Sequence, residues 1–170
     1  METPDLFRAH LESHHAASFA WALSCCRYDH VEAEDVLQAV YLKVLDGRAV
    51  YDGRAAFRTW LFSVIRNTAA SQRRWSIFRR LRSIPLDHGS REFRSQAEGP
   101  AALAARSECA ERLLRALAQL PRRQREVLHL VFYQELTIAE AALVAGISVG
   151  SARTHYERGK KRLRERMEAK

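Results

Sequence analysis

The sequence predicts an all-α protein with two small helical domains joined by a flexible linker. Three observations support this fold class. Apolar residues recur at three- and four-residue steps through most of the 170 residues, and no alternating strand pattern persists. One stretch loses the helical pattern and collects proline, glycine, serine and charged residues, as linkers do. We therefore expect a first domain at 1–80, a linker at 81–107 and a second domain at 108–170.

The first domain is expected to contain long helices. Apolar residues spaced from Phe7 to Cys26 predict a helix over about 4–27. Asp29 with Glu32 three residues later forms a possible capping box, in which each side chain binds a free backbone N–H, before a helix at about 31–45. Two Asp-Gly pairs then predict a loop over 46–56. A further helix is expected from about Phe57 through Trp75, with Arg80 as the furthest end that the pattern allows.

The second domain is expected to end in a helix-turn-helix. A leucine stripe predicts one helix, and Pro121 fits the first turn of another, whose apolar residues are Val127, Leu128, Leu130, Val131 and Phe132. Thr137 and Glu140 form a capping box for a short helix over 138–145. Gly146 suits the left-handed position that ends it, and Ser148 is a good N-cap for the last helix.

The last helix has two distinct faces. At about 100° per residue, one face carries Val149, Ala152, Tyr156, Gly159 and Leu163, which we expect to pack inward. The opposite face and its flanks carry Ser151, Arg153, Thr154, His155, Glu157, Arg158, Lys160, Lys161, Arg162 and Arg164. Small polar residues near the helix start suit base edges, and flanking cations suit phosphates, so the pattern favours DNA binding. An ordinary amphipathic helix with a solvated basic face would give the same pattern.

Composition narrows the remaining possibilities. The net charge of +8 suits a polyanionic partner, and no apolar run approaches the ~20 residues that span a bilayer. The first ten residues lack signal-peptide features, so we expect a cytoplasmic protein.

The three cysteines give no sign of a disulfide or a metal site. Cys25 and Cys26 lie in an apolar stretch, so we expect them to be buried free thiols, and Cys109 has no C-x-x-C partner. No histidine stands at a recognisable ligand spacing from them, so we expect no metal and no cofactor.

A basic helical chain is also compatible with an enzyme that modifies nucleic acid. It would need clustered carboxylates for a metal, or a nucleophile with its base. The acidic residues are instead scattered along helix surfaces, and His14, His15 and Cys25 have no matching partner. We therefore expect no catalytic residues.

Three segments resemble parts of bacterial sigma factors. The run LPRRQREVLHLVFYQELTIAEAALVAGISVGSARTHYERGKKRLR (120–164) resembles their promoter-reading C-terminal domain. AEDVLQAVYLKVL (33–45) resembles their core-polymerase-binding helix, and FRTWLFSVIRNTAASQRR (57–74) is similar to the helix that meets the −10 element. Their order and the short chain resemble an extracytoplasmic function (ECF) sigma factor of the sigma-70 family.

The resemblance implies a function and its partners. The chain would bind core RNA polymerase, through the β′ clamp coiled coil and the β flap, and direct it to promoter DNA. The implied polymerase-binding residues are Glu34, Asp35, Gln38, Tyr41 and Leu42. The implied −10 DNA-binding residues are Arg54, Arg58, Trp60, Arg66, Asn67, Arg73 and Arg74. The implied −35 DNA-binding residues are Ser151, Arg153, Thr154, His155, Glu157, Arg158, Lys161 and Arg162. Spacing alone favours a place in the core for Trp60 over a role as a base-stacking platform.

Two further expectations follow from the resemblance. ECF members are usually held inactive by an anti-sigma factor, which here would cover Asp35, Gln38 or the DNA-facing side of the second domain. Glu135 stands where the family usually has glycine, so the preceding helix should end in a different way. The alternative to a sigma factor is a free-standing transcriptional regulator that uses only the helix-turn-helix.

Overall fold

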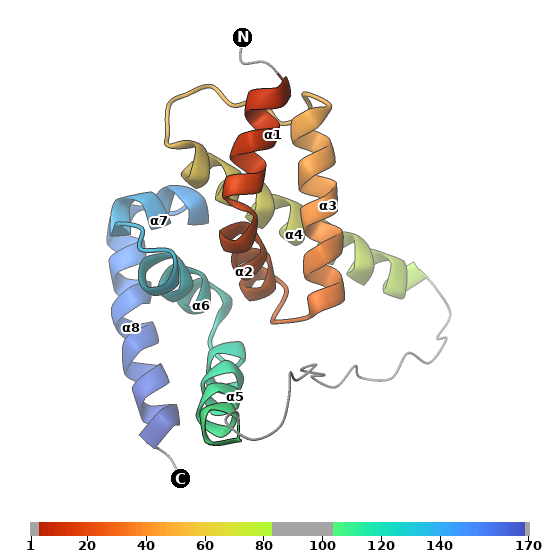
Figure 1. Ribbon diagram of the computed structural model, residues 1–170. Coiled ribbons are helices and arrows are strands. Elements are labelled where there is room, and N and C mark those ends of the chain that lie inside the picture. The colour runs from red at the N-terminus through yellow and green to blue at the C-terminus, as the bar shows by residue number, and fades with distance from the viewer. Residues whose placement is uncertain (1–3, 83–103, 169–170) are drawn as a thin grey trace.

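The computed structural model describes residues 4–82 and 104–168, and every regular element in these residues is a helix (Figure 1). The all-α class is therefore confirmed. In chain order the elements are α1 (Pro4–Ser13), α2 (His15–Cys25), α3 (His30–Leu45), α4 (Phe57–Arg82), α5 (Ala104–Ala118), α6 (Arg122–Leu128), the π-helical turn η1 (His129–Tyr133), α7 (Ile138–Ala145) and α8 (Val149–Glu168). We call α1–α4 the first module and α5–α8 the second module.

The single helix expected over 4–27 is wrong, because the chain breaks at His14. This residue is the N-cap of α2 and has φ −104° and ψ 5°, outside the helical region. The rings of His10, His14 and Phe7 all lie within about 6 Å of Phe57, so α1 packs on the start of α4. The break lets α1 and α2 follow different directions against the same neighbours. No glycine or proline marks this position in the sequence.

The core of the first module lies between α2, α3 and α4. Trp21 is fully buried, and its Nε1 donates a 2.9 Å hydrogen bond to the Phe62 carbonyl oxygen, which fixes α2 against α4. Val36 and Val40 of α3 are buried in the same cluster. At the start of α3, Asp29 Oδ1 accepts a 3.0 Å hydrogen bond from the Glu32 N–H, which confirms the Asp29 half of the predicted capping box.

The second module begins with α5 and α6. Pro121 is the N-cap of α6 and so precedes the first turn in which it was expected. After Leu128 the helix widens into η1, which adds a residue to the turn. Phe132, one of the apolar residues of the expected helix, is 64% exposed, and its ring centroid lies 5.8 Å from that of Tyr156.

The helix-turn-helix is present with the predicted bounds for its first helix. Thr137 Oγ1 accepts a hydrogen bond from the Glu140 N–H, and Glu140 Oε2 accepts one from the Thr137 N–H, which completes the capping box. Gly146 has φ 61° and ends α7 in the left-handed region, as predicted. Ser148 Oγ then accepts a 3.1 Å bond from the Ser151 N–H at the start of α8.

The two modules pack directly on each other. Leu130, Leu136, Ala141 and Val144 of the second module belong to the same buried cluster as Trp21 and Phe62 of the first. In Figure 1, α7 lies beside α4, and α6 lies next to α2, in agreement with the contacts between these helices. Of the linker expected at 81–107, the first two residues extend α4, residues 104–107 begin α5, and residues 83–103 lie outside the described residues.

Candidate functional site

Helix α8 presents its polar face to solvent. Every candidate −35 residue is exposed except the half-buried His155. On the opposite side Ala152 and Gly159 are buried, and Tyr156 and Leu163 are half-buried, as the periodicity predicts. Val149, expected inward, is instead largely exposed. The face that the sequence assigned to DNA is therefore available to a ligand.

The close approach of α8 to α6 depends on Gly159. A Cβ atom added at this residue would lie 2.9 Å from Leu128 Cδ1 and 3.3 Å from Gln124 Cβ. On the outer side, Glu157 pairs with Lys160 at 3.0 Å, and Thr154 Oγ1 donates to the Gly150 carbonyl oxygen. Arg158 is exposed on the same side of α8.

The candidate polymerase-binding residues lie along one side of α3. Glu34, Asp35, Gln38 and Leu42 are exposed, and Leu42 is 56% exposed despite its apolar side chain. Tyr41 is half-buried, and burial raises the pKa of its hydroxyl above the usual value. This side of α3 combines carboxylates, an amide and apolar surface, which suits a protein partner with basic and apolar groups.

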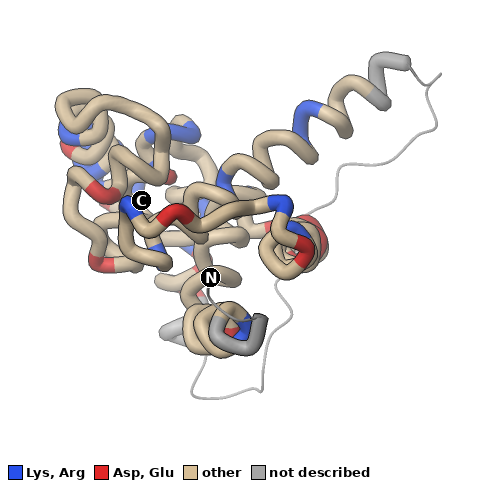
Figure 2. The backbone as a smooth tube through the Cα atoms, turned by 90° about the horizontal axis from the view of Figure 1, so that it is seen from above, with Lys and Arg blue, Asp and Glu red and all other residues tan. Residues whose placement is uncertain are grey.

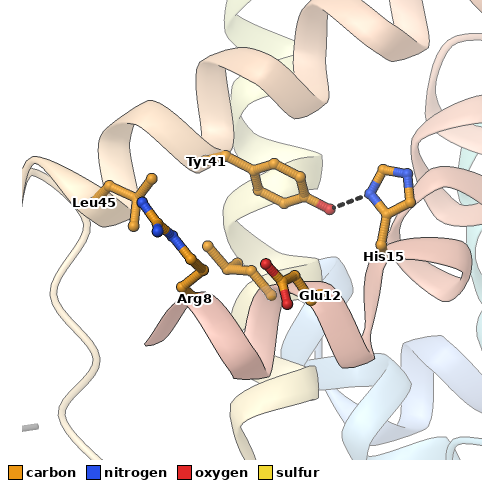
Figure 3. Close-up of a pocket in the computed structure, with 6 residues that line it drawn as sticks. Arg8, Glu12, His15, Tyr41 and Leu45 are labelled. Carbon is orange, nitrogen blue, oxygen red and sulfur yellow. Dashed lines mark hydrogen bonds between the residues drawn. The ribbon is translucent and has the colours of Figure 1, made fainter. Parts of the chain in front are cut away.

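A hollow of about 390 Å³ lies between α1 and α3 beside this surface (Figure 3). Its lining is mostly apolar and includes Leu11 and Leu45, with Arg8 and Glu12 at the rim. The Tyr41 hydroxyl and His15 Nδ1 lie 3.0 Å apart across it, so one hydrogen bond links α2 to α3. The hollow therefore continues the α3 surface toward α1.

The candidate −10 residues fall into two groups. Arg54, Asn67 and Arg74 are exposed, and Arg54 pairs with Asp52 at 3.3 Å. The others are held by contacts within the protein. Trp60 packs against Tyr51 and Phe57, and the Arg73 guanidinium donates a 2.7 Å hydrogen bond to the Cys25 carbonyl oxygen.

Arg58 and Arg66 contact the second module. The Arg58 guanidinium donates to the backbone carbonyl of Gln134 and to Gln134 Oε1. Arg66 is 9% exposed, and its Nε lies 3.2 Å from Glu126 Oε2. The structure therefore places two candidate DNA-binding residues in the contact between the modules, where the second module covers them.

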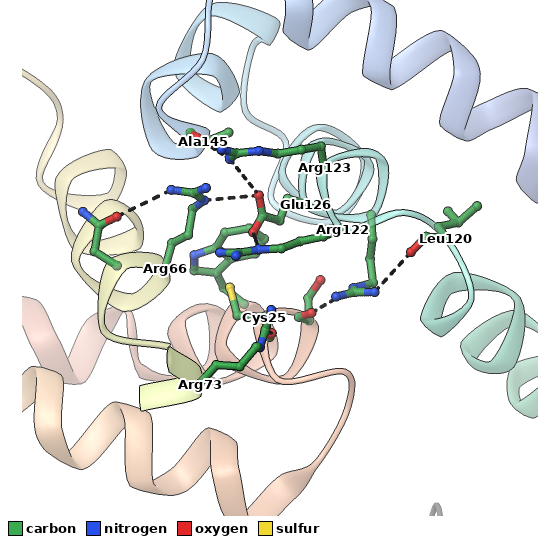
Figure 4. A network of polar contacts seen from close by, with 12 residues as sticks. Cys25, Arg66, Arg73, Leu120, Arg122, Arg123, Glu126 and Ala145 are labelled. Carbon is green, nitrogen blue, oxygen red and sulfur yellow. Dashed lines mark hydrogen bonds and ion pairs between the residues drawn. The ribbon is translucent and has the colours of Figure 1, made fainter. Parts of the chain in front are cut away.

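Glu126 is the centre of this contact (Figure 4). Its side chain is 1% exposed, and it also pairs with Arg122 at 2.7 Å and with Arg123 at 3.2 Å. Arg123 donates in addition to the Ala145 carbonyl oxygen at the end of α7. Burying a carboxylate is costly unless it is paired and hydrogen-bonded, and here three guanidinium groups surround it.

Two further side chains bridge the modules. Arg125 is buried and donates to the carbonyl oxygen of Ser24, and burial lowers its pKa. Gln134 Nε2 donates to the Ala17 carbonyl oxygen at 3.2 Å. Residues Glu126 and Gln134 were not among the predicted site residues. The spacing of Arg122 and Glu126, four apart just before the apolar run that starts at Val127, was the available signal for a charge close to the core.

His129 is buried at the same contact. Its ring lies 5.4 Å from the Trp21 ring and stacks on Tyr133. Burial lowers the pKa of His129 to about 4, so the ring is neutral at pH 7. Its Nε2 lies 3.2 Å from Gln134 Nε2 and can accept that hydrogen bond only when neutral.

Among residues 4–82 and 104–168, the thiols and carboxylates form no recognisable reactive centre. Cys25 and Cys26 are buried and free, and burial raises the pKa of Cys26 to about 12. In the described part of the chain, His, Cys, Asp and Glu side chains do not gather into a group able to hold a metal ion. Among residues 4–82 and 104–168, no helix has the length and apolar character needed to cross a membrane.

Comparison with known proteins decides the family. Models of the sigma-70 family match residues 10–75 as region 2 and residues 110–163 as region 4. The chain is 34% identical over 146 residues to the ECF RNA polymerase sigma factor SigX of Bacillus subtilis, a match that covers 82% of this chain and 73% of SigX. The chain belongs to the ECF sigma factors of the sigma-70 family.

Other ECF sigma factors give the same result. SigL of Mycobacterium tuberculosis is 33% identical over 156 residues, which cover 89% of this chain and 84% of SigL. The fold is similar to that of the sigma factor RpoE of Bartonella quintana, solved with the anti-sigma factor NepR, with a TM-score of 0.77, 24% identity, and 96% and 97% of the two chains covered. As a sigma factor, the chain binds RNA polymerase and is not an enzyme.

Proposed function

We propose that this ECF sigma factor directs core RNA polymerase to promoters by reading the −35 element with α8 and the −10 element with the first module. The exposed polar face of α8 carries this proposal. Its start bears Ser151 and Thr154, which are small enough to approach base edges in a major groove. Arg158 can fork onto a guanine, and Arg153, His155, Lys161 and Arg162 lie where they can hold phosphates.

The exposed side of α3 is proposed to bind the polymerase. Asp35 and Gln38 would make charge-assisted contacts with basic residues of the β′ clamp coiled coil. Leu42, Tyr41 and the adjoining hollow would accept an apolar side chain of that partner, with Glu34 at the edge. The second module would meet the β flap. These partners place the protein in the bacterial cytoplasm.

Binding of the −10 element by Arg58 and Arg66 requires the modules to separate. We call the packing of the two modules on each other the closed arrangement. In it, the Glu126 carboxylate and the Gln134 oxygens bind the two guanidinium groups that would otherwise hold phosphates. Arg54, Asn67 and Arg74 remain exposed and could make the first contact. We propose that polymerase binding, which must hold the two modules on separate promoter elements, supplies the free energy for this opening.

An anti-sigma factor is the proposed regulator. RpoE, whose fold is similar, was solved with the anti-sigma factor NepR. Here such a partner would cover Asp35, Gln38 or the polar face of α8, because polymerase and DNA need these surfaces. Pull-down from uninduced native cells should recover this partner, and recovery of polymerase alone would argue against it.

Gel filtration with core polymerase followed by run-off transcription tests the function. We expect the chain to co-elute with core enzyme and to yield a promoter-dependent transcript. If neither occurs, the proposal fails. Tight binding to the promoter without core enzyme would instead support a free-standing helix-turn-helix regulator.

A further inference from the structure

One carboxylate interrupts a cationic stretch of α8. From Val149 to Arg164 the charged residues are Arg153, Glu157, Arg158, Lys160, Lys161, Arg162 and Arg164. Figures 1 and 2 both place α8 at the edge of the molecule, where a DNA duplex can approach it. Phosphates repel a carboxylate at close range, so a negative charge on this helix weakens DNA binding unless another contact compensates for it.

Glu157 has a compensating charge within the same helix. Its Oε1 lies 3.0 Å from Lys160 Nζ, and the two side chains are 61% and 37% exposed. An exposed ion pair contributes little by itself, because water screens it and both side chains lose conformational freedom. The pair therefore fixes the carboxylate only if Lys160 is held by a further contact.

An aromatic pair supplies that further contact. Lys160 Nζ lies over the Tyr156 ring, 4.6 Å from its centroid, within the range at which a ring face attracts a cation. The Tyr156 ring is in turn stacked on Phe132 of η1, with centroids 5.8 Å apart and the ring planes at 26°. A chain of contacts thus runs from η1 to the carboxylate on α8, and it passes through Phe132, Tyr156 and Lys160.

The base that suits Glu157 follows from the chemistry of the carboxylate. An ionised carboxylate only accepts hydrogen bonds and has about four lone-pair sites, so it can accept from a base while it is paired with Lys160. In the major groove cytosine presents its N4 amino group as a donor, whereas guanine presents acceptors at N7 and O6 and thymine presents one at O4. Adenine places an N7 acceptor next to its N6 donor. Cytosine is therefore the base that Glu157 selects.

We propose that Lys160 is a positioning residue, which holds the Glu157 carboxylate toward the amino group of a cytosine in the −35 element and is itself held by Tyr156 and Phe132. The inference rests on the proposed promoter function and names the base that one of its residues reads. Lys160 then acts on a single base position, through Glu157. A lysine that only bound a phosphate would strengthen binding to every sequence alike.

Transcription by core polymerase and the full chain, from a promoter library randomised at the −35 element, tests the inference. Glu157→Gln should lower the preference for cytosine at one position by roughly 5- to 100-fold. Lys160→Met keeps the apolar stem without the charge and should lower the same preference by roughly 2- to 5-fold, whereas Lys160→Arg should keep most of it. Lys161→Met is the matched control, because it removes a neighbouring exposed cation and should weaken all promoters alike.

Two further variants follow the chain of contacts. In the Glu157→Gln background, Lys160→Met should cause no further loss of preference at that position, because its effect passes through the carboxylate. Phe132→Ala should lower the cytosine preference by up to the factor found for Lys160→Met. Because the preference is a ratio between promoters, a smaller amount of folded protein does not change it.

The outcomes separate positioning from phosphate binding. An intact cytosine preference in Lys160→Met, with all promoters weakened alike, would show that Lys160 only binds a phosphate and would overturn the inference. Loss of a preference for another base in Glu157→Gln, or no change at any −35 position, would overturn it as well. Absence of a promoter-dependent transcript with the wild-type chain would instead reject the proposed function.

Discussion

Arg66 of α4 and Glu126 of α6, which are 60 residues apart in the chain, form a buried ion pair with Nε and Oε2 3.2 Å apart. The pair joins the first module to the second at the point where the first module carries its candidate −10 residues. Arg122 and Arg123 complete the shell around the same carboxylate. This contact therefore covers Arg66, and it adds to the shared apolar core and the Arg58–Gln134 bond in holding the modules together.

Replacing Glu126 by glutamine should open the closed arrangement. The change leaves Arg66 buried without a counter-charge, and breaking one side of a buried pair costs on the order of 3 kcal/mol. Arg122 and Arg123 are over a third exposed and contribute less. Small-angle X-ray scattering should show a larger radius of gyration for Glu126→Gln, with helical content by circular dichroism retained. Glu111→Gln removes an exposed ion pair with Arg115 and should change neither quantity. A radius equal to that of wild type in Glu126→Gln would contradict the proposed role.

Two glycines of α8 should respond oppositely to alanine. Gly150 has open space around its Cα, so Gly150→Ala gains helix propensity, up to about 1 kcal/mol. Gly159→Ala gains the same propensity but drives a methyl group into Leu128 and Gln124, and overpacking costs roughly 1–3 kcal/mol. Urea unfolding should therefore show Gly150→Ala at or above wild type and Gly159→Ala below it. Equal stability of the two variants would mean that α8 does not pack on α6 as described.

Glycine at position 135 should stabilise the protein. Glu135 has φ 52°, in the left-handed region that costs a residue with a Cβ roughly 1–2 kcal/mol, and its side chain is exposed. Part of the gain is offset by the greater freedom of glycine in the unfolded chain, which leaves about 0.5–1 kcal/mol for Glu135→Gly. The same replacement at exposed Glu165 within α8 should destabilise by about 1 kcal/mol. Thermal unfolding of the two variants checks both signs.

Acid should destabilise the contact between the modules through His129. The pKa of this buried ring is lowered to about 4 from 6.5, so the unfolded state takes up its proton first as the pH falls. The contribution of the neutral ring is complete above pH 6.5 and is lost as the pH falls toward 4, by up to about 3 kcal/mol. His129→Gln keeps an acceptor for Gln134 and cannot take up a proton. Urea unfolding at pH 7 and pH 4.5 should show a smaller loss in His129→Gln than in wild type, while exposed His30→Gln should behave as wild type.

The features of the fold that could be predicted are those set by residues close together in the sequence. The capping box at Thr137, the left-handed Gly146 and the inward face of α8 depend on residues within a few positions of each other, and all three were predicted correctly apart from the exposed Val149. The break at His14 carries no such local signal, because it follows from packing against Phe57 far along the chain. The π-helical turn η1 likewise has no marker in the sequence.

The candidate site was predictable only where a helix face alone defines it. The exposed residues of α3 and α8 follow from periodicity, whereas the burial of Arg58 and Arg66 depends on which helix packs across α4. Glu135 shows a further limit. The missing glycine suggested a different helix end, but this expectation is wrong, since glutamate adopts the left-handed conformation itself. The surrounding fold offsets the local strain of this conformation. An argument from residue propensity alone treats that strain as prohibitive for glutamate.

Transcription from a promoter library tests the central claim most directly. Core polymerase with wild-type protein would be compared with the Arg158→Ala and Thr154→Ala variants on promoters varied separately at the −35 and −10 elements. The account predicts that each variant relaxes the preference at one or two −35 positions, by roughly 1–3 kcal/mol for a lost bidentate contact, and leaves the −10 preference unchanged. An unchanged −35 preference in both variants would contradict it.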